Sequence, residues 1–273
     1  MTESSNLNAP ASQASILSTI AMITVKLRIS LIWTVLVATP LFAAKFWETK
    51  EFTKWSEKEC LEILSKSPWA YSNSFGNVPP IGDQTAGIDK RFSGAAEPMW
   101  GEVESTQVFE FRLLTAKPIR MALARMKMLQ KPGDPSLKDQ ITKYVNAPPG
   151  REIVIQIGFR TVPTGAAPSA VHDINRYFLG ATLADFRSTT SLASEKSGVV
   201  PIVAYLPPGP NRSFPAFVFP RFNEAGEHSF TSETRQIMLR SELTPTVAGQ
   251  KMKYDIFIRM TPAQMMYKEE FAF

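Results

Sequence analysis

The sequence predicts an α+β fold with a short N-terminal helical lead, two central helices and a mostly antiparallel, sandwich-like, β-rich C-terminal half. Apolar residues recur at helical spacing in three segments before residue 150, and alternate with polar residues in most segments after it. The 273-residue chain is 44% hydrophobic and 20% charged, which is sufficient for a folded core. Its 21 prolines favour short strands and loops over a helical bundle.

Residues 1–43 are predicted to be a signal and targeting region. Residues 29–44 carry no charge and follow Lys26 and Arg28, the order of segments in a secretory signal peptide. The apolar stretch is shorter than the roughly 20 residues of a transmembrane helix. Met22 begins a more typical signal and is a candidate start of translation. We therefore expect an exported protein, periplasmic or extracellular; a chain anchored by an uncleaved signal is the alternative.

Residues 44–100 are predicted to form the helical lead and an irregular segment. Ser56 and Glu59 have the spacing of a capping box, so a helix is expected to begin at Ser56. Pro68 ends this helix because the residue before a proline avoids helical geometry. Residues 71–101 are rich in Asn, Gly, Pro and Ser, and we expect an irregular coil there.

Four large aromatic residues gather in the lead, and two interpretations of them stay open. The residues are Trp47, Phe52, Trp55 and Trp69. Exposed rings would stack on sugars or peptides, which makes Trp47, Trp55 and Trp69 candidate partner-binding residues. Buried rings would instead dock the short helix on the domain, and Trp55 with Cys60 would form a hydrophobic staple. We favour the structural interpretation.

Residues 101–273 are predicted to form one β-rich domain. Pro118 opens its first helix, which ends near Lys131, and Pro135 opens a second helix that ends before Pro148. The pattern of residues 182–192 does not decide their secondary structure, and a strand is one interpretation. A third helix is expected over 169–180, a single helical turn after Thr261, and strands over 109–113, 153–159, 199–206, 214–219, 234–243, 251–260 and 266–273.

Two of these strands carry more detailed expectations. Pro215 and Pro220 place strand 214–219 at a sheet edge, because proline cannot donate a ladder hydrogen bond. In strand 251–260 the side chains that share one face are apolar: Met252, Tyr254, Ile256, Ile258 and Met260.

The helix expected over 118–131 combines basic and apolar residues. Arg120, Arg125 and Lys127 are its candidate partner-binding residues, because a basic amphipathic helix can bind an acidic membrane surface or an acidic partner. Its methionines could form an adaptable binding surface. The alternative, which we favour, is a helix that packs on the sheet with its basic ends in solvent, since the charges are interrupted.

The sequence lacks the common catalytic and metal-binding motifs. No HExxH, CxxC, GxGxxG, GxxxxGK[ST] or GxSxG pattern occurs. His172 and His228 have no second ligand at metal-site spacing apart from Asp173. We therefore assign no catalytic, metal or cofactor residues and expect no cofactor. Glu102 and Glu104 are candidates for an acid–base pair if the protein is a hydrolase.

The segment 52–59, followed by Leu61, Leu64 and the run Ser67-Pro68-Trp69-Ala70, resembles a block in a family of uncharacterised exported bacterial proteins. In that family a signal peptide precedes the W-S-x-x-E…S-P-W-A block and a β-rich region. The resemblance implies export and a β-rich fold. It implies no activity and transfers no functional residue.

The leading hypothesis is a non-catalytic binding or scaffolding protein of the cell envelope, whose partner is an unknown protein or an envelope polymer. The net charge of +5 is mild and evenly spread, so no nucleic acid partner is expected. One alternative is an envelope hydrolase whose site follows no known motif. The other is a protein that makes peripheral contact with a membrane through its basic helix.

Overall fold

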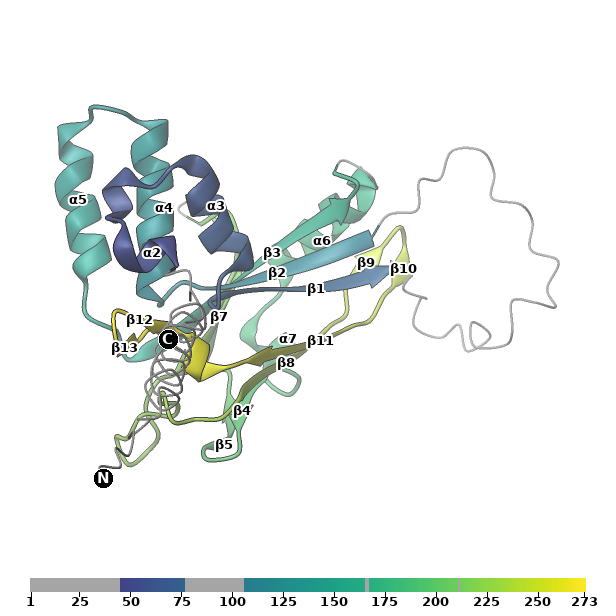
Figure 1. The fold of residues 1–273 in the computed structure, drawn as a ribbon. Helices are drawn as coiled ribbons and strands as arrows, with labels where there is room; N and C mark the ends of the chain where they lie inside the picture. The colour runs from purple at the N-terminus through teal and green to yellow at the C-terminus, as the bar shows by residue number, and fades with distance from the viewer. Residues whose placement is uncertain (1–44, 77–105, 165–166, 211) are drawn as a thin grey trace, which may run out of the picture. The chain divides into compact units, whose positions relative to one another are not determined.

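Two antiparallel sheets dominate the part of the chain that the computed structural model describes, which is residues 45–76, 106–164, 167–210 and 212–273 (Figure 1). In spatial order, the five-stranded sheet contains β1 (Ala70–Gly76), β2 (Thr106–Leu113), β3 (Glu152–Val162), β7 (Ala216–Pro220) and β6 (Ala204–Leu206). The four-stranded sheet contains β11 (Tyr254–Met260), β8 (Ile237–Leu243), β4 (Ser191–Ser194) and β5 (Gly198–Pro201). Two short pairs join β9 (Thr246–Val247) to β10 (Gln250–Lys251), and β12 (Met266–Tyr267) to β13 (Glu270–Phe271).

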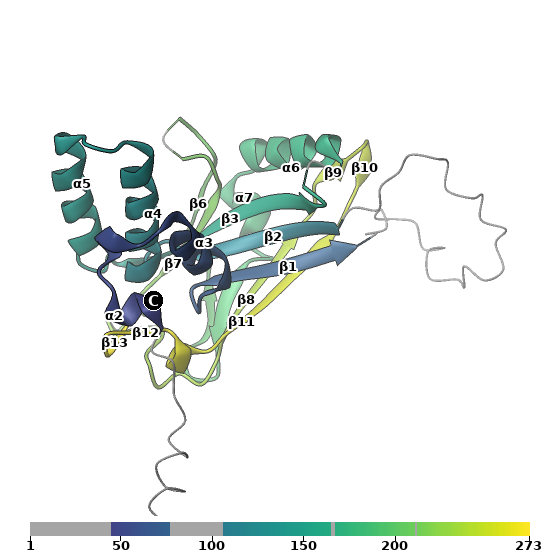
Figure 2. The same cartoon turned by 45° about the horizontal axis from the view of Figure 1, so that its top comes forward.

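Several of the helices gather at one end of these sheets (Figures 1 and 2). The helical elements of the described residues are α2 (Phe46–Thr49), η1 (Phe52–Lys54), α3 (Glu57–Lys66), α4 (Lys117–Gln130), α5 (Pro135–Asn146), α6 (Pro168–Gly180), α7 (Leu183–Phe186) and η3 (Pro262–Gln264). Helices α3, α4 and α5 lie together at one end of the sheets, and α6 lies near β3 and β9. The predicted α+β class with a strand-rich C-terminal half is therefore confirmed.

Aromatic side chains join the two sheets into a sandwich-like core. Phe109 of β2 meets Tyr254 of β11 with ring centroids 5.0 Å apart. Phe186 of α7 contacts Phe217 of β7 at 5.0 Å and Tyr205 of β6 at 4.7 Å. Each of these five side chains is buried. Such clusters bury large apolar areas and dominate the energetics of a core.

The capping box at the start of α3 is confirmed. The Ser56 hydroxyl accepts a hydrogen bond from the Glu59 amide at 3.3 Å, and the Ser56 amide donates to the Glu59 carboxylate at 2.7 Å. Trp55 and Cys60, on either side of the cap, are both fully buried. The lead is not a separate body: β1 pairs with β2 along its length, and residues 46–273 form one compact unit.

The irregular coil predicted over residues 71–101 is wrong for its first part, because residues 70–76 form the edge strand β1. Its Ser, Asn and Gly residues hide the alternation of buried and exposed positions. The remainder of the predicted coil, residues 77–100, lies outside the described residues, as do the targeting region 1–43 and the candidate start at Met22.

Strand β7 occupies the interior of its sheet, so the edge position predicted from Pro215 and Pro220 is wrong. It lies between β3 and β6. Pro220 is the last residue of the strand, and Pro215 precedes the first residue and uses only its carbonyl, which accepts from the Ile157 amide at 2.9 Å. A proline at a strand terminus costs no ladder hydrogen bond in the middle of a sheet.

Two other predicted strands are divided in the structure. Residues 199–206 form β5 and β6, which belong to different sheets, with the chain crossing between them at buried Ile202. Residues 266–273 form the hairpin β12–β13, whose turn has positive φ at Lys268 and Glu269, as a tight hairpin turn requires. The ambiguous segment 182–192 contains α7 and the start of β4.

Candidate functional site

The three candidate tryptophans of the lead are core residues. Trp47 is 6% exposed, and Trp55 and Trp69 are fully buried. The rings of Trp47 and Trp69 meet edge to face at 6.2 Å, and the Trp55 indole donates to the Lys50 carbonyl at 3.1 Å. Because almost no ring surface is accessible, this arrangement gives a partner little aromatic surface to bind.

The three candidate basic residues of α4 have three different surroundings. Arg120 is buried and donates to the carbonyls of Tyr144 and Ala147 at 3.0 and 2.8 Å. Arg125 donates from Nε to the Trp55 carbonyl at 2.7 Å and so joins α4 to the lead. Lys127 is exposed to solvent. These residues therefore do not form one continuous basic face on the helix.

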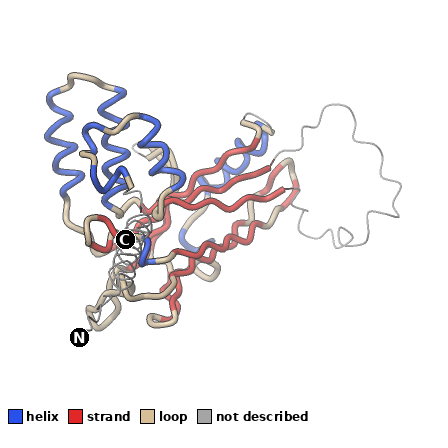
Figure 3. The backbone as a smooth tube through the Cα atoms, in the orientation of Figure 1, coloured by secondary structure: helices blue, strands red, loops and turns tan. Residues whose placement is uncertain are grey.

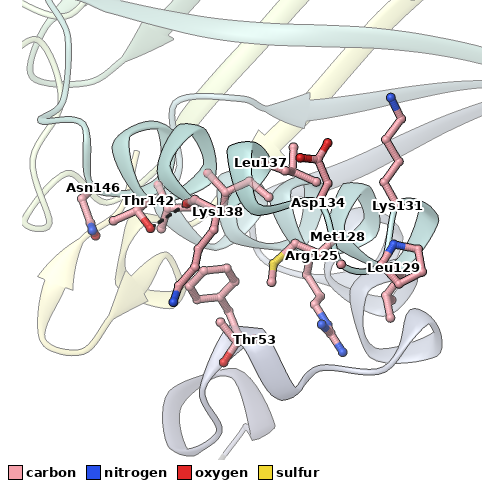
Figure 4. A pocket seen from close by; sticks show the side chains of 15 residues that line it. Thr53, Arg125, Met128, Leu129, Lys131, Asp134, Leu137, Lys138, Thr142 and Asn146 are labelled. Carbon is pink, nitrogen blue, oxygen red and sulfur yellow. Dashed lines mark hydrogen bonds between the residues drawn. The ribbon is translucent and has the colours of Figure 1, made fainter.

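An apolar groove lies between α4, α5 and η1 (Figure 4). Its volume is about 730 Å³. Its apolar lining consists mainly of Phe52, Met128, Leu129, Leu137, Ile141 and Val145. We call this space the α4–α5 groove. Its size lies within the range of small-molecule sites, roughly 300–1,000 Å³.

The sequence produces this groove through the apolar faces of its two helices. In α5, Leu137, Ile141 and Val145 recur every four residues and are buried. In α4 the apolar positions wrap more broadly, and Leu129 remains 38% exposed. α5 therefore covers only part of the apolar surface that α4 presents, and the rest lines the groove.

Charged residues stand along the edges of the groove. Arg125, Lys131, Lys138 and Asp134 all belong to its lining. In Figure 4, Arg125 and Lys138 extend toward the side on which Thr53 lies, whereas Lys131 and Asp134 extend to the other side. The edge beside Thr53 therefore carries two cations, and no carboxylate lies among the groove-lining residues there.

A second open space lies on the opposite side of the contact between α4 and α5. It measures about 370 Å³ and includes Lys127 and Tyr144 in its lining. Leu137 and Ile141 border this space as well as the groove. The apolar contact between the two helices at Leu137 and Ile141 therefore has open volume beside it in both spaces.

The other groups considered from the sequence show no catalytic arrangement in the part of the chain described. His172 lies on α6 and contacts the Arg176 guanidinium at 2.7 Å, and His228 packs its ring on Phe222 at 4.6 Å. Burial raises the pKa of the Cys60 thiol to about 11, so the thiol stays protonated at neutral pH. Glu102 and Glu104 lie outside the described residues.

The described residues lack two further features that would point to a function. They contain no group of three or more His, Cys, Asp or Glu side chains placed to bind a metal ion. None of their helices has the length and apolar character needed to cross a membrane.

Comparisons with known proteins add no assignment. No protein-family model matches the chain, and neither a curated protein nor a solved structure is significantly similar to it. The resemblance of the 52–70 block to exported bacterial proteins therefore stays a prediction.

The groove was not anticipated from the sequence, although part of its signal is present. The sequence predicts a possible adaptable surface on the methionine-rich apolar side of α4, and Met128 and Leu129 of this helix line the groove. The sequence does not single out Lys138 or Thr142. A polar residue at the edge of a groove occupies the same kind of position in the sequence pattern as a polar residue in solvent. Only the placement of α5 beside η1 brings them to this site.

Proposed function

We propose that the protein is an exported, non-catalytic binding module of the cell envelope, and that its α4–α5 groove binds an amphipathic segment of a partner protein with acidic residues beside its apolar anchors. The observation that carries this proposal is the apolar groove of about 730 Å³ with Arg125 and Lys138 on one edge. Apolar grooves between helices commonly receive the apolar face of a partner helix.

The length of the groove suits a short helical segment. From Leu137 to Val145 the α5 wall is about 12 Å long at 1.5 Å per residue. Apolar residues at positions i, i+4 and i+7 of a partner helix span a similar length, about 10 Å. Three such side chains would replace solvent against Met128, Leu129 and Ile141.

The charges favour an acidic protein segment over a fatty-acyl ligand. Arg125 comes from α4 and Lys138 from α5, so the cations are distributed between both walls. A segment with several carboxylates can pair with both, whereas an acyl chain carries one anionic head. Opposite charge on the partner would also increase the rate of association and make binding sensitive to salt.

The groove is tested with a labelled synthetic helical peptide that carries leucine at i, i+4 and i+7 and glutamate beside them. Binding is measured by fluorescence anisotropy. We expect Leu129→Glu to weaken binding about tenfold, because it puts a carboxylate into the apolar lining, and Lys138→Glu to weaken it by a similar factor. The matched control is Leu179→Glu, which makes the same change at an exposed position of α6.

Three outcomes would count against the proposal. A peptide with lysine in place of glutamate should bind weakly; equal binding would remove the role of the basic edge. Equal effects of Leu129→Glu and Leu179→Glu would place the binding elsewhere. Saturable binding of a fluorescent fatty acid, lost in Leu129→Glu, with no peptide binding would identify an acyl ligand instead.

The export part of the proposal rests on the uncharged segment 29–44 and its preceding basic residues. It is tested by intact-mass measurement of the protein recovered from fractionated cells. We expect an envelope-located form whose mass corresponds to cleavage near Ala43. Recovery of the protein only from the cytoplasm would contradict export, and an envelope form that retains residues before Ala43 would indicate an uncleaved signal.

A further inference from the structure

A small cavity distinct from the α4–α5 groove lies where the first turn of α4 meets the end of α5 and the C-terminal hairpin. It measures about 180 Å³. Its lining includes Thr115, Lys117 and Arg120 from the α4 side and Asn146 from the end of α5. Residues of β12 and β13 close the remaining side, with Glu270 among them.

Arg120, which lines this cavity, is one of two buried arginines in the described residues. Arg120 is 9% exposed and Arg221 is 7% exposed. Their hydrogen-bond partners are backbone carbonyls only: Tyr144 and Ala147 for Arg120, and Gly150 and Glu152 for Arg221. Among the residues that the structure describes, neither guanidinium forms a salt bridge with a carboxylate, and burial lowers the pKa of both.

This arrangement is energetically unusual. A buried cation is costly unless an opposite charge compensates it, and here the positive charge of Arg120 further lowers the pKa of Arg221. Among the described residues no carboxylate forms a salt bridge with Arg120, so an anion in the cavity would compensate a charge that is contacted there only by backbone carbonyls.

Two polar atoms of the cavity wall have no hydrogen-bond partner. They are Nε of Arg120, which is a donor, and Oγ1 of Thr115, which can donate or accept. Both are buried, and both residues line the cavity. Buried polar groups in native structures are nearly always paired, so two unpaired ones beside the same cavity indicate a common partner.

The local backbone adds to this environment. α4 begins at Lys117 with Ala116 as its N-cap, which supplies no capping side chain, and its first turn contains no acidic residue. The amide groups at a helix start carry partial positive charge and favour an anion. Lys117 adds a full positive charge on the cavity wall.

We propose that this cavity binds a small oxyanion of the phosphate type, held by Arg120, Thr115 and Lys117 at the first turn of α4. An oxyanion has several acceptor atoms, so it can accept from the guanidinium, the ammonium and the hydroxyl together. Glu270 is exposed at the cavity and repels an anion that approaches from its side, so the oxyanion sits against the α4 wall.

The site is tested by isothermal titration of the full chain with inorganic phosphate at constant ionic strength, with acetate as the comparison. We expect saturable binding of phosphate and weaker binding of acetate. Thr115→Val, which keeps the shape of the side chain, and Lys117→Met should each weaken phosphate binding about tenfold. Lys127→Met is the matched control, because it removes the same charge from the same helix outside the cavity.

A second arm separates free phosphate from a lipid headgroup. It measures co-sedimentation of the protein with phosphatidylcholine vesicles that contain phosphatidic acid. Phosphate binding without vesicle binding identifies a free oxyanion, and vesicle binding lost in Thr115→Val and Lys117→Met identifies a phosphate headgroup. Absence of binding in both arms overturns the proposal, as does an equal loss of affinity in Lys127→Met. Thr115, Lys117 and Lys127 do not line the α4–α5 groove. The outcomes of this test are therefore distinguishable from failure of the peptide-binding proposal.

Discussion

Between the two sheets, aromatic side chains such as Phe186 and Phe217 are completely buried and contact one another directly. Between α4 and α5, Leu137 and Ile141 border two open spaces, one of about 730 Å³ and one of about 370 Å³. Figure 3 shows the strands concentrated away from these helices. The core between the sheets is thus closely packed, whereas the helical end retains open apolar space.

This difference has a physical cause. A strand in the interior of a two-layer structure is covered on both sides by its neighbours and on one face by the opposite sheet, so its apolar side chains leave little open space. α5 packs mainly against α4, and a helix pair covers only a limited part of each apolar surface. Residual open volume between helices is therefore expected, and it is where the candidate groove lies.

The largest expected effect compares the same substitution in the two regions. Ile157 of β3 is fully buried, whereas Ile141 of α5 borders open space on two sides. We expect Ile157→Ala to lower the free energy of unfolding by about 4 kcal/mol and Ile141→Ala by about 2 kcal/mol, because a cavity costs less where open volume already exists. Urea unfolding at neutral pH measures both values. Equal losses would show that α5 is packed as tightly as the sheet.

A smaller effect is expected at the junction between the lead and α4. The Ser56 hydroxyl caps α3, so Ser56→Ala should lower the free energy of unfolding by about 1 kcal/mol. The control is Ser65→Ala on the same helix. The Ser65 hydroxyl is exposed and donates to the Leu61 carbonyl one turn earlier, so it caps no helix end. That variant should stay within about 0.5 kcal/mol of the wild type. An equal or larger loss in the control would show that the loss in Ser56→Ala does not come from the cap, because the higher helix propensity of alanine favours the folded control.

The same junction should respond to pH through Glu59. The ammonium of Lys50, at 2.8 Å, and the amide of Ser56 lower the pKa of this carboxyl to about 2 from an ordinary 4.5. Because the folded-state pKa is the lower one, the stabilisation is complete above about pH 5 and is lost as the pH falls toward 2.

Glu59→Gln should therefore be less stable than the wild type at neutral pH, and the difference should shrink as the pH falls through this range. Unfolding curves at a series of pH values measure this change. Lys50→Met should reduce the pH dependence of the wild type, because the ammonium is the largest cause of the shift. If the difference in free energy of unfolding between Glu59→Gln and the wild type does not vary with pH, the pKa of Glu59 is not lowered by these contacts.

The smallest effect is expected on the outer face of the four-stranded sheet. Phe257 is 40% exposed there, and the guanidinium groups of Arg240 and Arg259 lie 5.4 and 5.1 Å from the centre of its ring. Exposed cation–π contacts contribute about 0.5–1 kcal/mol, so Phe257→Ala should cost no more than about 1 kcal/mol. A loss as large as that of Ile157→Ala would show that this face is covered by another part of the structure in solution.

Local patterns were sufficient for several elements. The capping box at Ser56, the proline that opens α4, and the alternation from Tyr254 to Met260 each depend on residues within a few positions of one another. Their geometry is fixed by local hydrogen bonds or by one buried face. The prediction failed at β1, where polar residues of an edge strand resemble a coil, and at β7, where prolines at the strand ends were interpreted as a sign of an edge.

The sequence by itself determined the α+β class, the helices around the capping box and prolines, and the absence of common catalytic motifs. The tertiary structure alone decided that β5 and β6 belong to different sheets, that the tryptophans of the lead are core residues, and that α5 leaves a groove against α4. It also placed Arg120 beside a cavity that the C-terminal hairpin closes, although the two are far apart along the chain. Binding sites of this kind depend on contacts between distant segments, and the local periodicity of a sequence carries no information about such contacts.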